Sequence, residues 1–184
     1  MPNARRRATA MYGTPLTLIG PELKVGDKAP EFTVRDQDGQ PFGLSNTRGR
    51  IRLISVIPSL DLPVCDAQTR RLNLEALQRD PQVEIITISG DLPFAQRRWC
   101  EAARINRMKV ASDYFDHSFS KAYGTLIKEL RLASCAIFII DAYDTIRYVE
   151  YVPEVGEQPD YDKALLVLKS LSGPFGRALR IGCS

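Results

Sequence analysis

The sequence predicts an α/β domain with a central mixed β-sheet flanked by helices. In the middle of the chain, short β-branched runs alternate with segments of helical spacing, which favours parallel strands joined by helices. Later, two apolar runs follow each other with only a short turn between them, which adds an antiparallel pair. The chain has 184 residues, 44% of them hydrophobic, and this suits one domain with a full core.

The first half of the chain contains a hairpin, two strands and a helix. A β-hairpin is expected at the start, with residues 15–20 as one arm, and a second strand is expected at residues 31–34. Asp and Gly residues at 36–39 form the turn that closes this strand. Residues 51–57 are short, β-branched and nearly all apolar, as in a buried strand. Helical spacing begins at Cys65.

The second half continues the alternation and ends with a helix. Residues 83–89 form another β-branched run, and Asp91-Leu92-Pro93 then opens a helix. Residues 135–141 are expected to form a buried strand, with residues 145–152 as its antiparallel partner. Pro159-Asp160 begins the last amphipathic helix. This order, β-β-α-β-α-β-β-α, is the thioredoxin-like arrangement with an added N-terminal hairpin.

Three parts are expected along the chain: a flexible basic N-terminus at residues 1–12, one domain at residues 13–171, and a tail at residues 172–184. The net charge is only +3, and the basic residues are mostly dispersed, so we expect no nucleic-acid binding. No apolar run approaches the roughly 20 residues that span a bilayer. The N-terminus also lacks the apolar core of a secretory signal. We therefore expect a cytoplasmic protein that does not bind membranes.

Cys65 is the strongest candidate for a reactive residue. It ends the run from Pro58 to Cys65, directly after a predicted strand and directly before a predicted helix. In the first turn of a helix, unpaired backbone N–H groups and the macrodipole favour an anion. The thiolate is such an anion and is the reactive form of cysteine. The sequence therefore predicts an activated thiol at this junction.

The other cysteines are Cys100, Cys135 and Cys183, all far apart in the sequence. In a cytosolic chain this pattern points to redox chemistry or a metal before structural disulfides. A zinc site made from Cys65, Cys100, Cys135 and His117 is an alternative, but it lacks paired C-x-x-C spacing, so no metal is expected. Packing alone is the alternative for Cys100, and Cys183 is expected to be a free, exposed thiol.

Five segments match the pattern of a known family. They are Pro15-Leu16-Thr17-Leu18 with residues 24–30, the Cys65 loop, residues 91–96 leading to Cys100, Ser112-Asp113-Tyr114 with His117-Ser118-Phe119, and residues 148–154 with Pro159-Asp160-Tyr161. On these residues, from about Gly13 to Leu171, the chain resembles the thiol peroxidase branch of the peroxiredoxins, of the atypical two-cysteine kind.

The resemblance implies a mechanism for two of the cysteines. Cys65 would be the peroxidatic thiol, reducing hydrogen peroxide and alkyl hydroperoxides and becoming a sulfenic acid. Cys100 would be the resolving thiol, and the Cys65–Cys100 disulfide would be reduced by thioredoxin or a similar dithiol. Because both cysteines fall on predicted helices, we expect a helix to unwind when they join. The family needs no cofactor, and its members suggest a homodimer.

Two positions of the expected substrate pocket depart from the family pattern. Pro58 is present, but Leu62 stands where the family has a threonine, and Cys135 stands where it has an arginine. Losing one preorganised polar group typically costs about 10² to 10³ in rate, so we expect attenuated peroxidase activity. Only helix-end effects are then expected to lower the pKa of Cys65. Cys135 is left open between inert core packing and a third active-site thiol beside Cys65.

These observations lead to one expected function and two alternatives. The first is an enzyme, a thioredoxin-dependent thiol peroxidase. The second is a redox-responsive binding or sensing protein that keeps the disulfide pair without efficient peroxidase turnover. The third is a protein with inert thiols that acts through surface contacts. The presence of both Cys65 and Cys100 argues against the third.

Overall fold

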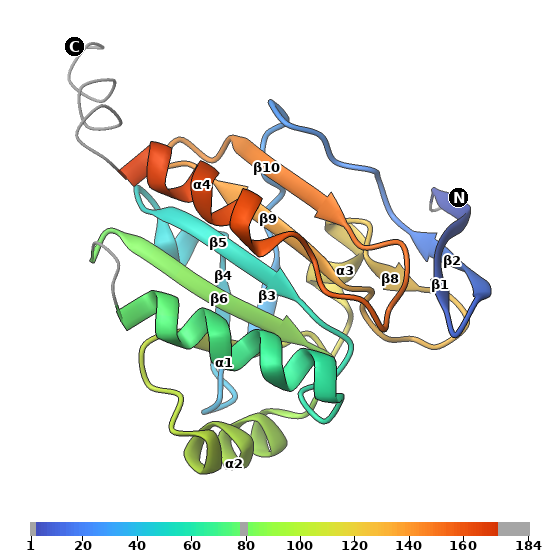
Figure 1. The fold of residues 1–184 in the computed structure, drawn as a ribbon, viewed down its shortest axis with the longest axis horizontal. Helices are drawn as coiled ribbons and strands as arrows, with labels where there is room; N and C mark the ends of the chain where they lie inside the picture. The colour runs from blue at the N-terminus through green and yellow to red at the C-terminus, as the bar shows by residue number, and fades with distance from the viewer. Residues whose placement is uncertain (1–2, 78–80, 173–184) are drawn as a thin grey trace.

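The computed structural model describes residues 3–77 and 81–172 and shows the α/β fold that the sequence predicts (Figure 1). The elements in chain order are β1 (Ala4–Met11), β2 (Thr14–Ile19), β3 (Thr33–Arg35), β4 (Pro41–Gly43), the 3₁₀ helix η1 (Leu44–Thr47), β5 (Ile51–Val56), α1 (Pro63–Leu77), β6 (Val83–Ser89), α2 (Pro93–Ala103), β7 (Lys109–Ser112), α3 (Ser118–Ala122), β8 (Leu126–Ile127), β9 (Ala136–Ile140), β10 (Ile146–Tyr151) and α4 (Tyr161–Ser172).

The central sheet is mixed, as expected. Its strand order is β10-β9-β5-β6-β7-β3-β4, and a smaller sheet has the order β1-β2-β8. β5, β6 and β7 run parallel, whereas β9 is antiparallel to β5 and β10 is antiparallel to β9. The two parallel connections pass through α1 and α2, which is the usual way to join parallel strands. The carboxyl ends of β5 and β6 therefore lie side by side at the same end of the sheet.

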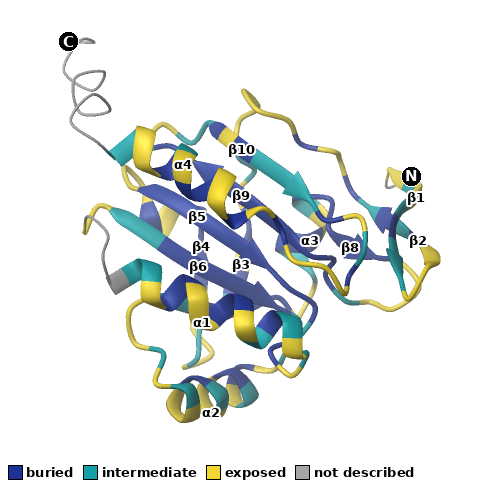
Figure 2. Ribbon diagram, in the orientation of Figure 1, coloured by how far each residue is buried: buried dark blue, intermediate teal, exposed yellow. Residues whose placement is uncertain are grey.

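The central strands are buried on both faces (Figure 2). α1 and α4 cover the face that is nearer in Figure 1, where Leu72 and Leu168 pack against Ile137 of β9. The other face packs against α3 through Phe119 and Phe138. Because successive side chains of a strand point to opposite faces, β9 supplies apolar residues to both cores. This explains why it appears in the sequence as a continuous apolar run.

The N-terminal hairpin is longer than the sequence suggested. Residues 1–12 were expected to be flexible, but β1 pairs with β2 at both of its ends, with a register shift between Arg5 and Thr9. Tyr12 and Gly13 both have positive φ, 51° and 76°, as a two-residue type I′ turn requires. Arg5 donates a hydrogen bond to a backbone carbonyl and lies 4.9 Å from the ring centroid of Tyr151. The expectation is therefore corrected for β1, where the arginines at the register shift do not prevent backbone pairing on either side of it.

The sequence pattern does not predict β4, β7, β8 or α3. These elements have three, four, two and five residues, which is too short for a periodicity to show. β7 nevertheless completes the parallel part of the sheet beside β6. The predicted tail at residues 172–184, apart from its first residue, lies outside the described residues, and so does Cys183.

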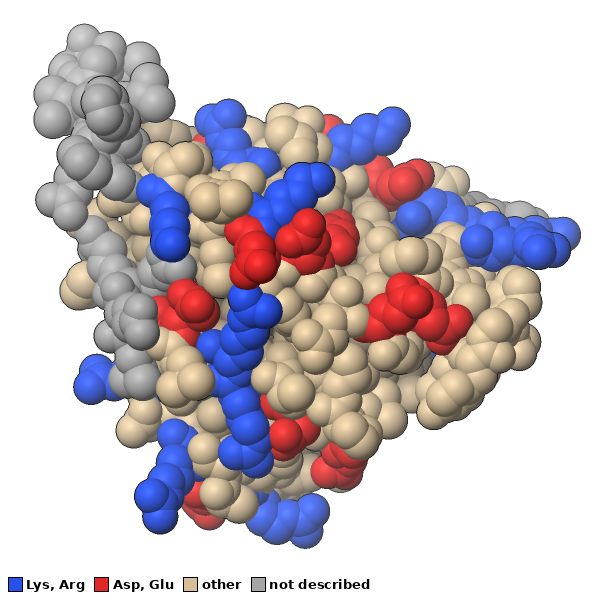
Figure 3. All heavy atoms as spheres, in the orientation of Figure 1, with Lys and Arg blue, Asp and Glu red and all other residues tan. Residues whose placement is uncertain are grey.

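Charges of both signs are intermingled on the face shown in Figure 3, with no broad region of one sign. Among the helices of the described residues, none is long and apolar enough to cross a membrane.

A buried arginine holds β5 and β9 in place. The side chain of Arg52 on β5 is 0% exposed. Its guanidinium donates a hydrogen bond of 2.7 Å to the carbonyl of Asp141 and another to the carbonyl of Arg50, and it pairs with the carboxylate of Asp144. Asp141 and Asp144 belong to the turn between β9 and β10. Arg52 therefore ties the central strand to the antiparallel pair beside it.

We predict that Asp144→Asn lowers the free energy of unfolding by about 1–3 kcal/mol, because the buried guanidinium of Arg52 loses its charged partner. Asparagine suits the left-handed backbone at this position, where φ is 61°. The control is Asp162→Asn, which removes an ion pair between Arg71 and a side chain that is 87% exposed. The control should change stability by less than about 0.5 kcal/mol. Equal losses in urea unfolding would contradict the assigned role of Arg52.

Candidate active site

Cys65 is the third residue of α1 and lies in its first turn, as predicted. Pro63 starts the helix with the restricted φ that suits the first helical position. The backbone N–H of Cys65 donates to the carbonyl of Leu62 at 2.9 Å. The residue is 0% exposed. Its sulfur therefore lies in a dry site at the positive end of a helix, where a thiolate is stabilised.

Asp91, which directly follows the turn after β6, holds the loop that leads to Cys65. Its carboxylate accepts hydrogen bonds from the Ser59 hydroxyl at 2.7 Å, the Leu60 backbone N–H at 2.8 Å and the Ser89 hydroxyl at 2.7 Å. From the sequence, Asp91 was only the start of the next helix. The position of Asp91 could have been inferred from the parallel strands, because the loops that follow parallel strands meet at the same end of the sheet. Asp91 is therefore a positioning residue that sequence reasoning missed.

Cys135 directly precedes β9 and lies on the same side of the sheet as α1. Side chains alternate along β9, with Ile137 and Ile139 in the core under α1 and α4. Cys135 continues that series because it is two residues before Ile137. Ala136 pairs with the last residue of β5, the strand that leads into the Cys65 loop. The strand register therefore brings Cys135 to the N-terminus of α1.

Cys65 and Cys135 are neighbours in one buried apolar cluster, and the Cys135 thiol can donate a hydrogen bond to the Cys65 thiolate. The hydrogen bond from Cys135 is the main reason why the pKa of Cys65 is lowered. Burial raises this pKa, the backbone N–H of Ser59 lowers it, and the negative charge of Asp91 raises it. The same contact and burial raise the pKa of Cys135. The pair therefore loses its first proton from Cys65. The expectation that only helix-end effects lower this pKa is corrected.

The proton of Cys135 has two acceptors within reach. The Sγ atom of Cys135 is 3.5 Å from the carbonyl oxygen of Val155, close enough for a thiol to donate to it. A thiolate is the stronger acceptor because it carries a full negative charge. Cys135 therefore donates to Val155 while Cys65 is neutral, and to Cys65 once that residue is a thiolate.

Cys100 lies on α2 and is 3% exposed. The side-chain amide of Gln37 donates a hydrogen bond of 3.2 Å to its Sγ atom. Burial raises the pKa of Cys100 to about 11, although the hydrogen bond from Gln37 acts in the opposite direction. Cys65, Cys100 and Cys135 are all free thiols and share one apolar cluster. Cys100 is thus a protonated thiol near neutral pH.

Trp99 fastens α2 to the first turns of α1. Its indole N–H donates to the carboxylate of Asp66 at 3.1 Å. Arg70 forms an ion pair of 2.9 Å with Asp66 and lies 5.4 Å from the centroid of the Trp99 ring. These contacts join the helix that carries Cys65 to the helix that carries Cys100. Any large movement of Cys100 must disturb them.

A mostly apolar cavity of about 220 Å³ lies beside the Cys65 loop. Its lining residues come from the hairpin turn, the start of α1 and the segment after β10: Met11, Tyr12, Leu62, Pro63, Val64, Val155 and Gly156. Of the three residues predicted to form a substrate pocket, Leu62 is in this wall, whereas Pro58 and Cys135 are buried. The leucine side chain makes this part of the site apolar at the position where the family has a threonine.

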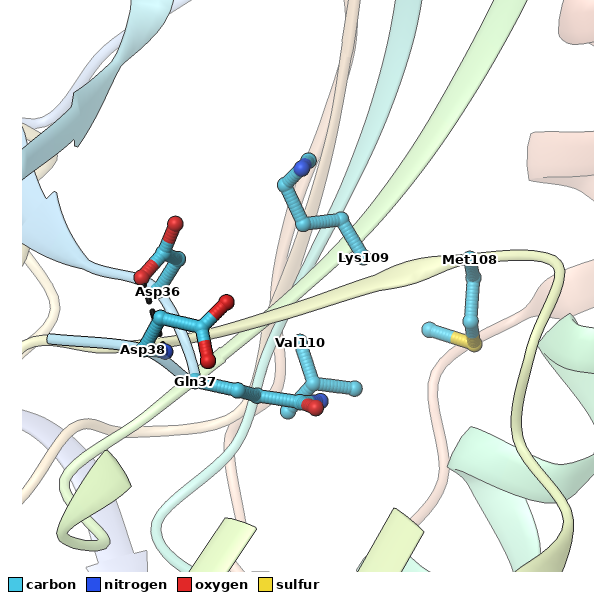
Figure 4. Close-up of a pocket in the computed structure, with 6 residues that line it drawn as sticks. All are labelled: Asp36, Gln37, Asp38, Met108, Lys109 and Val110. Atoms are coloured by element: carbon cyan, nitrogen blue, oxygen red, sulfur yellow. Dashed lines mark hydrogen bonds between the residues drawn. The ribbon is translucent and has the colours of Figure 1, made fainter. Parts of the chain in front are cut away.

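A second hollow, of about 210 Å³, lies between the turn after β3 and the start of β7 (Figure 4). Its lining residues are Asp36, Gln37, Asp38, Met108, Lys109 and Val110. Gln37 links it to the active-site cluster through its hydrogen bond to Cys100. None of the lining residues carries a thiol, so this hollow offers no thiol nucleophile for peroxide reduction.

The alternative zinc site does not assemble in the described part of the chain. His117 precedes α3, where burial lowers its pKa, and it is not in the cluster of the three cysteines. Within residues 3–77 and 81–172, no group of three or more His, Cys, Asp or Glu side chains is arranged to hold a metal ion.

The fold and the site define a class of redox protein: a thioredoxin-like domain with a thiol at a helix N-terminus and further free thiols around it. The redoxin family model matches residues 24–165. The thiol peroxidase of Halalkalibacterium halodurans is 54% identical over 158 residues, covering 86% of this chain and 95% of that protein. The thiol peroxidase of Bacillus subtilis is 47% identical over 159 residues, with the same shares covered. This chain belongs to the redoxin family and is a peroxiredoxin-type enzyme.

Solved structures agree with this assignment. A peroxiredoxin-like protein from Aquifex aeolicus matches with a TM-score of 0.83 and 38% identity, covering 91% of this chain and 99% of that one. A thiol peroxidase from Chromobacterium violaceum, at 23% identity, has a TM-score of 0.79 and covers 88% of this chain and 95% of that one. The second likeness concerns the fold alone. The thioredoxin-like prediction and the resemblance to thiol peroxidases are confirmed.

We predict that Cys135→Ala moves the thiolate titration of Cys65 to higher pH, because the main hydrogen bond to the thiolate is lost. Cys135→Ser, whose hydroxyl can still donate, should leave the titration close to its original position. The measurement is the thiolate absorbance against pH, with Cys65→Ser subtracted and Cys100 and Cys183 replaced by serine. An unchanged titration in the alanine variant would show that Cys135 does not stabilise the thiolate.

A separate prediction concerns Asp91. Asp91→Ala removes a negative charge that raises the pKa of Cys65, so the thiolate should form at lower pH. The rate of reaction with peroxide should nevertheless fall by about 10- to 100-fold, because the loop from Ser59 to Leu60 is no longer held. Stopped-flow oxidation and the thiolate titration measure the two effects separately. A faster reaction would show that the charge of Asp91, and not its positioning of the loop, dominates.

Proposed function

We propose that this protein is a thiol-dependent peroxidase that reduces hydrogen peroxide and alkyl hydroperoxides at Cys65. The observation that carries the proposal is the state of this thiol, which is held at the N-terminus of α1 with a lowered pKa. Hydrogen bonds from Cys135 and from the Ser59 N–H stabilise its anionic form. A buried cysteine that served only in packing would have its pKa raised instead.

In the first step the Cys65 thiolate attacks one oxygen of the peroxide, and the O–O bond breaks. The sulfur keeps that oxygen as a sulfenic acid, and the other oxygen leaves, takes up a proton and becomes water or an alcohol. No metal or organic cofactor enters this step. Because Cys65 is 0% exposed, the peroxide reaches it when the loop between β5 and α1 opens.

In the second step Cys100 acts as the resolving thiol and condenses with the sulfenic acid, releasing water and forming the Cys65–Cys100 disulfide. The two cysteines start on separate helices, whereas a disulfide needs Cα atoms about 4.4–6.8 Å apart. The Trp99–Asp66 contact would break and part of a helix would unwind. In the last step thioredoxin or a similar dithiol reopens the disulfide by thiol–disulfide exchange.

The setting of this reaction is also part of the proposal. We place the protein in the cytoplasm, where dithiol reductants keep such thiols reduced. We also propose a homodimer. Ser112 donates a hydrogen bond to the Asp91 carbonyl, so the segments that carry Phe94 and Phe115 begin side by side. These two side chains are 77% and 70% exposed, which suits a contact with a second copy.

The turnover is expected to be attenuated. Leu62 cannot donate a hydrogen bond to the thiolate or the peroxide, and the Cys135 thiol is a weaker donor than a cation. These substitutions leave the thiolate formed but the peroxide poorly oriented. The complete burial of Cys65 supports a second candidate function, a redox-responsive binding or sensing protein whose slow oxidation changes its contacts.

The test of the proposed function is stopped-flow oxidation of the reduced chain by hydrogen peroxide and by an alkyl hydroperoxide. Trp99 is the single tryptophan and adjoins Cys100, so its fluorescence reports events at α2. We predict a peroxide-dependent change that is slow and that is absent in Cys65→Ser. Turnover with a dithiol reductant supports the enzyme, whereas oxidation without turnover supports the sensing protein. No oxidation of Cys65 by either peroxide would overturn both.

The attenuation leads to a further prediction. Replacing Leu62 by threonine together with Cys135 by arginine should raise the rate of peroxide reduction by at least about tenfold, given about 10² to 10³ per polar group in comparable sites. Circular dichroism and thermal unfolding check that the variant is folded. If the original chain already reacts near the diffusion limit, or the folded double variant gains nothing, the attenuation is absent.

A further inference from the structure

The Cys65 thiol has two potential partners that differ in placement. Cys135 lies in the same buried cluster as Cys65, directly before a strand that is held in register by the backbone pairing of β9 with β5. Cys100 lies on α2, where its sulfur accepts a hydrogen bond from Gln37. Cys65 and Cys135 are both 0% exposed. The shorter path to a disulfide is therefore between Cys65 and Cys135.

We propose that Cys135 is a second resolving residue, which forms a disulfide with Cys65 inside the folded site. The proposal rests on the proposed function, since it starts from the Cys65 sulfenic acid. It goes beyond that function, because Cys135 has no reaction in the mechanism that uses Cys65 and Cys100 alone. The resulting Cys65–Cys135 bond forms before any helix unwinds.

The reaction balances without another reactant. The sulfur of Cys135 attacks the sulfur of the Cys65 sulfenic acid, the S–O bond breaks, and the S–S bond forms. The hydroxyl group leaves with the proton of Cys135 as water. Both electrons of the new bond come from Cys135, which is oxidised as the sulfenic acid is reduced.

Oxidation of Cys65 also removes the obstacle to this attack. In the reduced site the hydrogen bond to Cys65, burial and the Cys65 charge all raise the pKa of Cys135, so its thiol is a poor nucleophile. A sulfenic acid is neutral, so the charge that Cys135 stabilised is gone. The Coulombic cause therefore ends when the sulfenic acid forms, and Cys135 becomes more reactive at the moment when it is needed.

The geometry sets the size of the movement. Cys65 and Cys135 are already neighbours in one buried cluster, and their sulfurs must close to a bond of about 2.05 Å. The first turn of α1 and the loop from Ser59 to Leu62 can provide this movement while α2 stays in place. The alternative route through Cys100 must break the contact between Trp99 and Asp66. The Cys65–Cys135 disulfide therefore forms first and protects Cys65 from further oxidation by a second peroxide.

The experiment uses the full chain with Cys183→Ser, which removes the fourth thiol. In this background, Cys100→Ser is treated with one equivalent of hydrogen peroxide, blocked with an alkylating agent and mapped by peptide mass spectrometry. The expected product is an intramolecular disulfide that joins the Cys65 and Cys135 peptides. Recovery of Cys65 as sulfenic or sulfinic acid, with Cys135 alkylated as a free thiol, would overturn the proposal.

The matched control is Cys135→Ser, because serine keeps a donor for the Cys65 thiolate but cannot form a disulfide. With Cys100 present, this control should still give the Cys65–Cys100 link, and under a large excess of peroxide it should accumulate several-fold more Cys65 sulfinic acid than the parent. Equal sulfinic acid in the two chains would contradict the protective role. Fluorescence provides a third readout, since closing the Cys65–Cys135 bond should leave the signal of Trp99 nearly unchanged.

The outcomes separate this inference from the proposed function. If Cys65 is not oxidised by peroxide in any variant, the proposed function fails and no resolving step takes place. If Cys65 is oxidised and joins only Cys100, the peroxidase proposal stands and the role of Cys135 is overturned. If diamide, a direct thiol oxidant, also fails to link Cys65 to Cys135 in Cys100→Ser under conditions in which an alkylating agent of similar size modifies Cys65, the two sulfurs cannot reach bonding distance, which overturns the geometric basis directly.

Discussion

The contact between the Cys65 and Cys135 sulfurs is the interaction on which the chemistry of this protein depends. It arises from the sheet, because β9 pairs with β5 and Cys135 continues the face of β9 that α1 covers. Arg52 holds these two strands together from within the sheet, and Asp91 holds the loop that carries the chain into α1. The reactivity of one thiol is therefore a consequence of strand register, of the buried Arg52 and of the partly buried Asp91.

A thiol in the place of a cation changes the balance of forces at the site. A guanidinium stabilises an anion through its charge, whereas the Cys135 thiol offers only a weak hydrogen bond, in a setting where burial penalises the charged form. The hydrogen bond still outweighs burial at Cys65, since the pKa of that residue is lowered. In return, the site gains a second sulfur that can react. In the proposed mechanism, slower attack on peroxide and faster capture of the sulfenic acid are two effects of one substitution.

Features set by local sequence were predictable, and features set by strand order were not. The strands at residues 51–57 and 83–89 and the helix start at Cys65 follow from β-branched runs and proline positions, which act over a few residues. The roles of Asp91 and Trp99 depend on which strands are neighbours, and no periodicity carries that information. The hydrogen bond from Cys135 similarly required the register of β9. The opening strand was missed because its arginines resemble a solvated tail, while its stability comes from backbone pairing.

The most direct test of the central contact is a residue-resolved titration of the reduced full-length chain by NMR, with ¹³C at the Cβ atoms of cysteine. The account predicts that the Cys65 signal moves to its thiolate position below the ordinary thiol range of about 8.5, while the Cys135 signal responds to that same transition but remains that of a thiol. Independent titration of both residues near the ordinary range would contradict it, because the two thiols would then share no hydrogen bond.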